Sequence, residues 1–356
     1  MPAMPPGALS GVVERLRAGL AGLHRRTAPP PVQLLEGVFG LLDAVALGAL
    51  CRLDVPDRLD RPTPLPDLAT ATGAPTEVVE RLVRYAAGRG WLRLDRRDRV
   101  RPTATTRFLR RDHPGGWRAW VDFACGPEVL AAAGQLMTAP ATPDAFTAAN
   151  GTPFFDWYTA HPERHAVFDA AMAAGGRMHG LALAKAVDWS GVGRVCDVGG
   201  GTGALLGVLL DQQPHLEGVL FDLDPVVERT VEHERLEVVG GDAFVGVPGR
   251  CDVYLLVNVV HDWDDDAVVA LLRNAAAAGG AGARVVVVEG ERRARPVDGI
   301  ALRTDLLMLA LAPGGRERTT AEVASLATAA GLGAVATVTL ASGDRAHTFE
   351  VAGTPS

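Results

Sequence analysis

A glycine run forms the part of this sequence best suited to binding a ligand. Residues 199–203 read Gly-Gly-Gly-Thr-Gly; they follow an apolar segment and precede a stretch with helical periodicity. Such a strand–loop–helix junction is where a nucleotide-like ligand meets a parallel sheet. A dinucleotide fingerprint requires glycine or alanine at position 204, and Ala204 satisfies it. The glycine pattern alone therefore leaves a dinucleotide and other adenosine ligands open.

Three aspartates narrow the choice of ligand. Asp197 lies two residues before the first glycine, Asp222 ends the next predicted strand, and Asp242 closes the strand after that. Asp222 suits the two hydroxyls of a ribose, and Asp242 suits an adenine amino group beside the Phe244 ring. Taken singly, each aspartate is as typical of a helix N-cap or a loop salt bridge as it is of a ligand-binding site. Together, three acids at successive strand ends repel a pyrophosphate, which favours an adenosine ligand without phosphates, such as S-adenosylmethionine.

His261 is the residue best suited to move a proton. It follows the apolar run 253–260, which predicts a strand and places the imidazole at the carboxyl edge of the sheet, where the glycine loop presents its ligand. A neutral imidazole can accept a phenol proton as the oxygen attacks the methyl group of a sulfonium, an effect of roughly 10²–10⁴ in rate. The alternative is a histidine that caps a helix before Asp262 and Trp263.

Five apolar runs predict the strands that must position these residues. They alternate with helical segments, which implies a doubly wound, Rossmann-like α/β domain with a parallel sheet covered on both faces. Residues 113–190, ahead of the sheet, are predicted to be helical, and an aromatic cluster at 153–158 is interpreted chiefly as core packing. The predicted strands are 194–198, 218–222, 236–239, 252–257 and 283–289.

The first third of the chain predicts helices followed by a hairpin. Helical periodicity runs from about residue 33 to 88, with Thr76 as a helix N-cap, and residues 91–94 and 99–101 form two strands that turn at 95–98. This order is a winged-helix pattern. Before it we expect a loosely attached helix and, at prolines 29–31, an extended linker. We therefore place a tail and winged-helix domain in 1–112 and a helical cap with the sheet domain in 113–356.

Composition, apolar run length and cysteine spacing limit the classes of protein to which this chain can belong. The chain has 356 residues, 48% hydrophobic and 22% charged, which is enough for two folded domains. The longest apolar run, 37–51, is too short for a bilayer span. The N-terminus lacks a cationic segment before an apolar block, and the four cysteines, widely spaced, form no metal-binding or redox pair. We therefore expect a cytoplasmic protein that binds no membrane and no metal; the cysteines are Cys51, Cys125, Cys196 and Cys251.

A basic segment raises a rival hypothesis of DNA binding. Residues 76–111 carry 11 arginines against four acids, inside a chain whose net charge is -7. A winged helix with Arg81 and Arg84 on one helix and further arginines at the wing tip suits contacts to phosphates in a regulator. The apolar helix 38–50, however, exceeds what a small domain buries internally and suits a subunit interface instead.

Taken together, these motifs resemble a known family. The sequence is similar to the S-adenosylmethionine-dependent O-methyltransferases of the plant caffeate and hydroxyindole type and to their bacterial relatives in aromatic natural-product pathways. The resemblance runs from about Val38 to the C-terminus. It is carried, in the family's order, by residues 195–203, 221–223, 241–244, 260–265, 288–289 and 314–319.

The resemblance implies roles for individual residues. It makes His261 the general base, flanked by Glu289 and Glu317, in an enzyme that methylates a hydroxyl of an aromatic or polyketide-type small molecule. It implies a homodimer whose N-terminal domain serves dimerisation rather than nucleic-acid binding. Residues similar to the family's acceptor pocket are Phe168, Met172 and Met308. Residues at cofactor-binding positions are Asp197, Gly199, Gly201, Asp222, Leu223, Asp242, Ala243 and Phe244.

One position departs from the family pattern. Plant relatives place a lysine, and many bacterial ones a serine, four residues before the histidine, whereas this chain has Val257. The family also includes members that keep the cofactor but perform hydroxylation, decarboxylation or pericyclic chemistry. The retention of His261, Glu289 and Glu317 favours methyl transfer over these alternatives.

Overall fold

The computed structural model describes residues 7–230 and 233–351, which form two compact units. The first unit comprises His24–Leu130 and Tyr158–Ala174. The second comprises the N-terminal segment up to Leu23, Ala131–Trp157 and the chain from Gly175 onward. The chain passes between them within four helices, so neither unit is continuous in sequence; these are α1 (Gly7–Thr27), α8 (Pro127–Thr138), α10 (Phe154–Ala160) and α11 (Pro162–Ala186).

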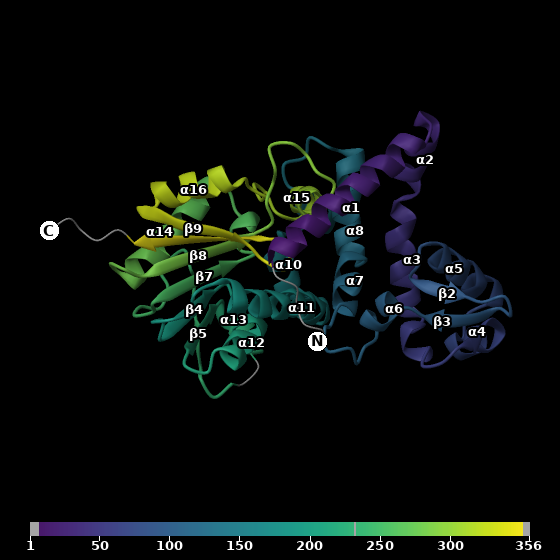
Figure 1. The fold of residues 1–356 in the computed structure, drawn as a ribbon, viewed down its shortest axis with the longest axis horizontal. Helices are drawn as coiled ribbons and strands as arrows, with labels where there is room; N and C mark the ends of the chain where they lie inside the picture. The colour runs from purple at the N-terminus through teal and green to yellow at the C-terminus, as the bar shows by residue number, and fades with distance from the viewer. Residues whose placement is uncertain (1–6, 231–232, 352–356) are drawn as a thin grey trace. The chain divides into compact units, whose positions relative to one another are not determined.

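The first unit combines helices with a small antiparallel sheet in which β3 pairs with both β1 and β2 (Figure 1). Its core uses the apolar face of α5, where Val79, Val83 and Ala86 are fully buried at helical spacing. The helices are α2 (Pro30–Phe39), α3 (Leu41–Arg52), α4 (Leu65–Thr72), α5 (Thr76–Gly88), α6 (Ala104–Phe108) and α7 (Arg118–Ala124), with a 3₁₀ turn at Pro56–Arg58; the strands are β1 (Thr63–Pro64), β2 (Leu92–Leu94) and β3 (Arg99–Pro102).

The predicted hairpin is present as β2 and β3, and the Asp95 carboxylate accepts from the N–H groups of Arg97 and Arg99 in its turn. Two local expectations are wrong. Thr76 is the first helical residue of α5, and Pro75 occupies the N-cap. Prolines 29–31 begin α2 instead of forming an extended linker, because proline has a helix-compatible φ and its missing N–H is not needed in the first turn.

An apolar stretch in this unit, Pro30–Arg52, is long and apolar enough to cross a membrane by length and composition alone. Core helices of soluble proteins pass the same test. Its first half is exposed, since α2 buries no residue, whereas Leu50 and Cys51 at its end are buried. Asp43 within it accepts from the Tyr85 hydroxyl and pairs with Arg89. The expected absence of a membrane span therefore stays a prediction.

The second unit contains a seven-stranded sheet of order β6-β5-β4-β7-β8-β10-β9. The first five are parallel, and β10 runs antiparallel to β8 and β9. Its strands are β4 (Arg194–Val198), β5 (Glu217–Asp222), β6 (Leu236–Gly240), β7 (Val253–Val257), β8 (Arg284–Glu289), β9 (Leu332–Thr339) and β10 (Arg345–Val351); its further helices are α9 (Ala145–Asn150), α12 (Ala204–Gln212), α13 (Asp224–Val227), α14 (Asp265–Gly279), α15 (Ile300–Leu311) and α16 (Thr320–Ala329).

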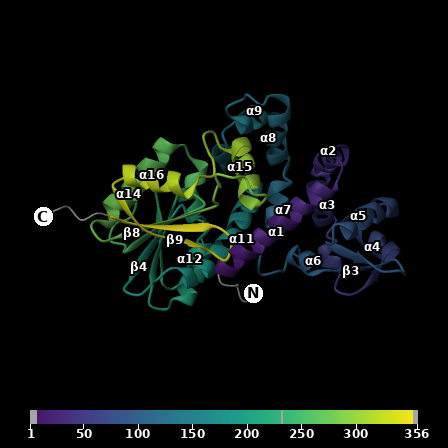
Figure 2. The ribbon, with the colours of Figure 1, turned by 45° about the horizontal axis from the view of Figure 1, so that its top comes forward.

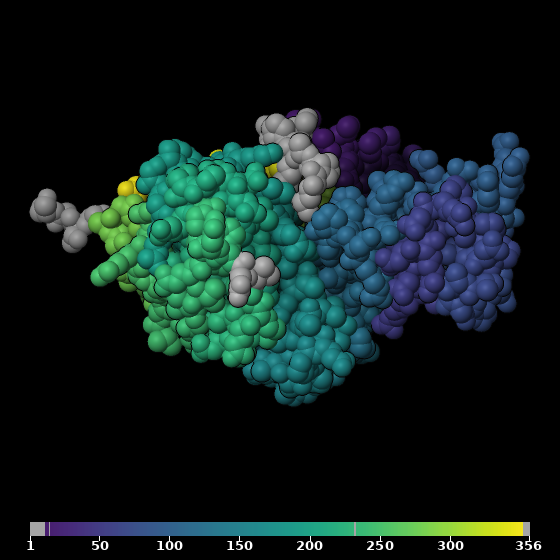
Figure 3. All heavy atoms as spheres, turned by 90° about the horizontal axis from the view of Figure 1, so that it is seen from below, coloured from purple at the N-terminus to yellow at the C-terminus, as the bar shows by residue number. Residues whose placement is uncertain are grey.

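Helices cover both faces of this sheet, as Figure 2 shows for α14 and α16 on one side and α12 on the other. Along β4, Cys196 and Val198 pack towards α14 and α16, whereas Val195 packs towards α12 and the end of α11. Figure 3 looks onto the α12 and α13 side of the unit, drawn in green. Because the five parallel strands end at one edge, the loops that follow them meet there.

The α/β class and all five predicted strands are confirmed, with boundaries that shift by one residue at most, except that the run preceding His261 ends as a strand at Val257. The expectation of a wholly parallel sheet is wrong. β9 and β10 were not predicted, because β9 is largely exposed and β10 alternates apolar residues with Arg345, His347 and Glu350. Neither strand presents the continuous apolar run that identifies a buried parallel strand.

Candidate active site

The glycine loop begins directly at the carboxyl end of β4. Gly199, Gly201 and Gly203 all have positive φ, between +61° and +82°, which side-chain-bearing residues rarely adopt. A Cβ on Gly200 would lie 2.5 Å from Leu220 and 2.8 Å from the Asp197 carboxyl, so only glycine fits there. The loop therefore turns tightly into α12 at the carboxyl edge of the sheet.

Asp197 lies under this loop, within β4, and does not cap a helix. It is 2% exposed, and among the described residues its Oδ2 has no hydrogen-bond partner. Burial, assisted by the nearby Asp222 carboxylate, raises the pKa of Asp197 to about 7, while His179 opposes the rise. A buried carboxylate with an unused acceptor suits a cationic or hydrogen-bond-donating group of a ligand.

Asp222 ends β5, and its two oxygens accept from the N–H groups of Gly201 and Leu223, each at 2.7 Å. Asp242 likewise accepts from the Phe244 N–H at 2.8 Å. A carboxylate has about four acceptor sites, so Asp242 retains capacity for a ligand, and Asp222 lies beside the glycine loop that it contacts. Asp222 does not cap a helix, because the N-cap residue of α13 is Leu223, which makes no side-chain hydrogen bond.

The segment after Asp242 brings an aromatic face to the same edge. The Phe244 ring meets Trp263 edge-on at 4.8 Å, and Phe155 stacks on the same indole at 6.2 Å. Asn274 of α14 fixes this segment by donating to the carbonyls of Ala243 and Phe244. Sequence reasoning missed Asn274, since nothing in its surroundings marks it, and assigned the aromatic cluster that includes Phe155 chiefly to the core.

His261 lies in a 3₁₀ turn, Val260–Asp262, that follows β7. It does not cap α14, because the Asp264 side chain accepts from Ala267 and fills that role. Its Nδ1 lies 2.9 Å from Oε2 of Glu289 and 3.4 Å from Oε1 of Glu317. Its Nε2 lies 3.6 Å from Oδ1 of Asp262. The structure therefore brings together the three predicted catalytic side chains, with the carboxylates on the Nδ1 side of the ring.

Both glutamates are positioned through backbone contacts. Glu289 is the last residue of β8, and its Oε1 accepts from the N–H groups of Val259 and Val260 at 3.1 and 2.9 Å. Glu317 donates its own N–H to Asp305 of α15 at 2.8 Å. Each glutamate is at most 3% exposed. The segments after β7 and β8 are thus locked to each other, with Oε2 of Glu289 turned to the imidazole.

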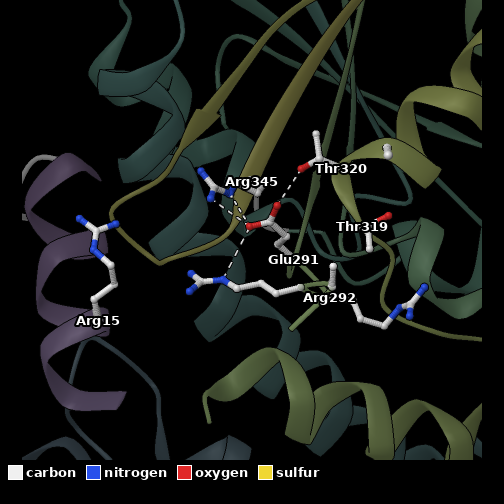
Figure 4. Close-up of a pocket in the computed structure, with 9 residues that line it drawn as sticks. Arg15, Glu291, Arg292, Thr319, Thr320 and Arg345 are labelled. Atoms are coloured by element: carbon white, nitrogen blue, oxygen red, sulfur yellow. Dashed lines mark hydrogen bonds and ion pairs between the residues drawn. The ribbon is translucent and has the colours of Figure 1, made fainter. Parts of the chain in front are cut away.

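A surface pocket of about 450 Å³ lies beside the loops that carry the two glutamates, and Figure 4 shows Glu291 at its centre. Glu291 pairs with Arg345 at 2.9 Å and accepts from the Thr320 hydroxyl at 2.9 Å. Glu291 also forms a backbone bridge with Arg318. These contacts tie the end of β8 to β10 and to the start of α16, which fixes the separation of Glu289 and Glu317.

Arg318 holds the turn that carries His261. Its guanidinium donates to the carbonyls of Val260 and Trp263, both at 2.7 Å, and to the Asp265 carboxylate at 2.9 Å. Arg318 lies inside a motif block already noted in the sequence, yet sequence reasoning gave it no role. Only the fold reveals that it contacts the backbone on both sides of the imidazole.

Charges in this cluster shift one another's pKa. Burial lowers the pKa of His261, but the Glu289 and Asp262 carboxylates outweigh burial and raise it well above 6.5. Burial raises the pKa of Glu317 to about 7 and that of Asp262 to about 6. The cluster therefore favours a proton on the imidazole, because the flanking acids stabilise its charged form.

The remaining predicted residues lie on three elements. Met308 is buried on α15, one turn after Asp305, in the second unit. Phe168 and Met172 lie half-buried on the part of α11 that belongs to the first unit, where Phe168 packs on Tyr158 and Phe123 at 5.1 and 5.5 Å. Val257, the last residue of β7, brings no polar group to the sheet edge.

Comparison with known proteins decides the family. Residues 134–333 match the model of the O-methyltransferase domain, more than half of the chain. The chain belongs to the S-adenosylmethionine-dependent O-methyltransferases. This O-methyltransferase is 33% identical over 309 residues to the mitomycin biosynthesis 6-O-methyltransferase of Streptomyces lavendulae, covering 84% of this chain and 87% of that one.

Two further relatives are informative about the cofactor and about the reactions of similar proteins. A methyltransferase of calicheamicin biosynthesis, solved in a form with S-adenosylhomocysteine bound, matches the O-methyltransferase with a TM-score of 0.82 at 31% identity, over 90% of this chain and 98% of that one. The aclacinomycin 10-hydroxylase of Streptomyces purpurascens is 32% identical over 84% of this chain and 83% of its own length. The cofactor is S-adenosylmethionine, and the resemblance seen in the sequence is confirmed.

Proposed function

We propose that this enzyme transfers a methyl group to a hydroxyl of an aromatic or polyketide-type small molecule, with His261 as general base. The observation that carries the proposal is the set of His261, Glu289 and Glu317, which lie at the same sheet edge as the glycine loop. The names of the mitomycin and calicheamicin relatives support the class of acceptor.

The residues at the sheet edge fit S-adenosylmethionine. Asp197 offers a buried unpartnered oxygen, Asp222 contacts the glycine loop and suits the ribose, and the Phe244 ring beside Asp242 suits the adenine. Gly199, Gly201, Leu223 and Ala243 complete the proposed cofactor site through their backbone. When bound, the cofactor supplies an electrophilic methyl group on a sulfonium. Val257 adds no polar contact to that set.

His261 would take the proton of the acceptor hydroxyl at Nε2. The two carboxylates near Nδ1 favour the tautomer with its proton on Nδ1, which leaves the Nε2 lone pair available. As the proton moves, Glu289 and Glu317 balance the new positive charge. We assign acceptor binding to Phe168, Met172 and Met308, whose apolar side chains suit an aromatic body.

Replacement of Asp222 tests the cofactor site. Asp222→Ala is expected to weaken S-adenosylmethionine binding by roughly 10- to 150-fold, since two hydrogen bonds to a charged acceptor contribute about 1.5–3 kcal/mol. Calorimetry measures the dissociation constant, with exposed Asp224→Ala as the matched control. Tight binding of NADH by the wild type, or unchanged cofactor affinity in Asp222→Ala, would refute this assignment.

The pH profile tests the charge cluster. Because His261 must be neutral to act as a base and its pKa is raised, kcat/KM is expected to increase as pH rises through a value well above 6.5. Glu289→Gln should move that ionisation to lower pH. It should also lower kcat by about 10²–10⁴, because its amide donates to Nδ1 and places the proton on Nε2.

The control for this profile is Glu350→Gln, which alters an exposed glutamate of β10 that lies opposite Arg284, at the other end of β8 from Glu289. It should keep the wild-type ionisation. Since Glu317 and Asp262 also titrate near neutrality, the apparent pKa belongs to the whole cluster. A Glu289→Gln profile that coincides with the wild type would show that Glu289 does not act on His261.

We further propose that the enzyme is a homodimer, joined through a winged-helix domain within residues 1–112, with the catalytic domain in 113–356. On α2 every residue is exposed, with Leu34 at 73% and Val38 at 69%, and such apolar exposure is typical of an interface. The expected result is a dimer in sedimentation that Leu34→Glu/Val38→Glu converts to monomers. Met137→Glu, which alters an exposed apolar residue elsewhere, should remain dimeric.

The basic segment 76–111 supports this structural role over DNA binding. Seven of its 11 arginines pair with acids of the same unit, which offsets much of the positive charge that phosphates would contact. We therefore propose no nucleic-acid partner and, with four free cysteines, a cytoplasmic location. The pairs are Arg81–Glu77, Arg84–Glu80, Arg89–Asp43, Arg99–Asp95, Arg101–Asp95, Arg110–Asp60 and Arg111–Asp54.

A further inference from the structure

We propose that His261, Glu289 and Glu317 form a zinc-binding site whose occupation blocks proton abstraction. One atom from each, Nδ1 of His261 and one carboxylate oxygen of each glutamate, lies within 4.8 Å of the other two. An imidazole nitrogen with two carboxylate oxygens is a donor set that Zn²⁺ accepts, with a further position left for water.

The distances fit a tetrahedral ion. Ligands placed about 2.0–2.2 Å from zinc in a tetrahedron are separated from one another by roughly 3.3–3.5 Å. Nδ1 lies 2.9 Å from Oε2 of Glu289 and 3.4 Å from Oε1 of Glu317, which is close to that separation. All three ligand atoms lie within 4.8 Å of one another, so a cation between them would be within reach of each side chain.

The ligand atoms are buried and not engaged elsewhere. Glu289 and Glu317 are 3% and 2% exposed. Within the part of the chain that the structure describes, Oε2 of Glu317 has no hydrogen-bond partner, and the contacts of Nδ1 of His261 and Oε2 of Glu289 lie within the triad. Two carboxylates this close in a buried setting repel each other, and a divalent cation between them removes that repulsion.

Contacts behind the ligands orient them. Oε1 of Glu289 is occupied by two backbone N–H groups, which leaves Oε2 as its ligand atom. The backbone of Glu317 is fixed by Asp305, and Arg318 holds the turn that carries His261. Such supporting contacts typically contribute 10- to 100-fold in metal affinity.

Zinc bound at this site would prevent His261 from acting as a base, because the metal changes the tautomer of the imidazole. A neutral imidazole that gives its Nδ1 lone pair to zinc carries its proton on Nε2, so Nε2 has no lone pair for the acceptor proton. Zinc would also take both carboxylates away from the imidazolium. This consequence rests on the proposed role of His261, whereas binding of the metal does not.

Binding is tested without cofactor or acceptor. Titration of the full chain with Zn²⁺ by calorimetry should show one strong site, and Co²⁺ should give the visible absorption of a tetrahedral ion. Glu289→Gln and Glu317→Gln should each weaken binding by about 10- to 100-fold. His261→Ala should abolish the cobalt absorption, and His233→Asn, which alters a histidine beside Asp211 elsewhere in the unit, should retain it.

Metal binding and inhibition of methyl transfer are measured in separate experiments. Circular dichroism confirms that each variant is folded, and in the wild type zinc should raise the melting temperature, a readout that needs no substitution. No cobalt absorption in the wild type, or absorption retained in all three triad variants, would overturn the site. In a methyl-transfer assay zinc should inhibit and a chelator should restore the rate. Binding at the triad with an unchanged rate would overturn the inhibition and count against His261 as the base, but not against the metal site.

Discussion

His261→Ala is expected to lower kcat by roughly 10²–10⁴ while the dissociation constant of S-adenosylmethionine changes little. The reason is geometric, because the imidazole is held on its Nδ1 side by Glu289 and Glu317 and none of the proposed cofactor contacts uses it. Single-turnover kinetics with a phenolic acceptor measures the chemical step, and calorimetry measures cofactor binding. If the chemical step is lost while cofactor binding is unchanged, His261 acts in base catalysis and not in positioning the cofactor.

A half-buried histidine outside the triad provides the control for this experiment. His233→Ala removes an imidazole of the same unit outside the triad and should leave kcat unchanged. If His261→Ala keeps full turnover, proton abstraction by this residue is the wrong mechanism. The same conclusion follows if the wild type converts its substrate without forming S-adenosylhomocysteine, the behaviour of a member that uses the cofactor for other chemistry, and Val257 is then the first residue to re-examine.

Arg318→Met is expected to destabilise the enzyme by about 3–5 kcal/mol and to lower the melting temperature by roughly 5–15 °C. The Arg318 side chain is 1% exposed and donates to two carbonyls and a carboxylate. A methionine keeps the stem but leaves the carbonyls of Val260 and Trp263 without this donor. Thermal unfolding measures the stability, and a loss of rate should accompany it because the turn bearing His261 is released.

Arg316→Met is the matched control for Arg318→Met. Arg316 pairs with the same Asp265 at 2.7 Å, but its side chain is 40% exposed, and solvent-exposed pairs of this kind contribute about 0–1 kcal/mol. The two arginines thus differ in burial and in their contacts to backbone carbonyls rather than in charge. Equal destabilisation by both substitutions would show that the pairing with Asp265, and not support of the His261 turn, explains the role of Arg318.

Much of the sheet edge that forms the proposed cofactor site was predictable, because the residues that shape the glycine loop lie close together in the sequence. Residues 194–203 contain a strand, a turn that only glycines satisfy and the start of a helix, and each part follows from residue type within a few positions. The order of strands along the chain then places Asp222 and Asp242 at the same edge, since parallel strands connected by helices all end on one side. The same rule located His261.

The edge strands and the helix start at Pro30 were not predictable in this way. β10 pairs with β8 and β9 pairs with β10, and the stability of these contacts does not come from the apolar pattern of the two strands. Prolines suit both a linker and a first helical turn, and the residue type alone does not decide between them.

The sequence by itself determined the family, the glycine loop and the identity of the three side chains that we propose act on a proton. Only the tertiary structure decided their arrangement. Glu289 and Glu317 are 28 residues apart in the chain, and their distances to Nδ1 depend on the bridge between Glu291 and Arg318 and on the contacts of Arg318 with the His261 turn. Similarly, Asn274 and Phe155 reach the site only because helices distant in sequence pack beside one sheet edge. Hydrogen bonds and burial between distant segments have no local signature, and for that reason residue spacing does not reveal them.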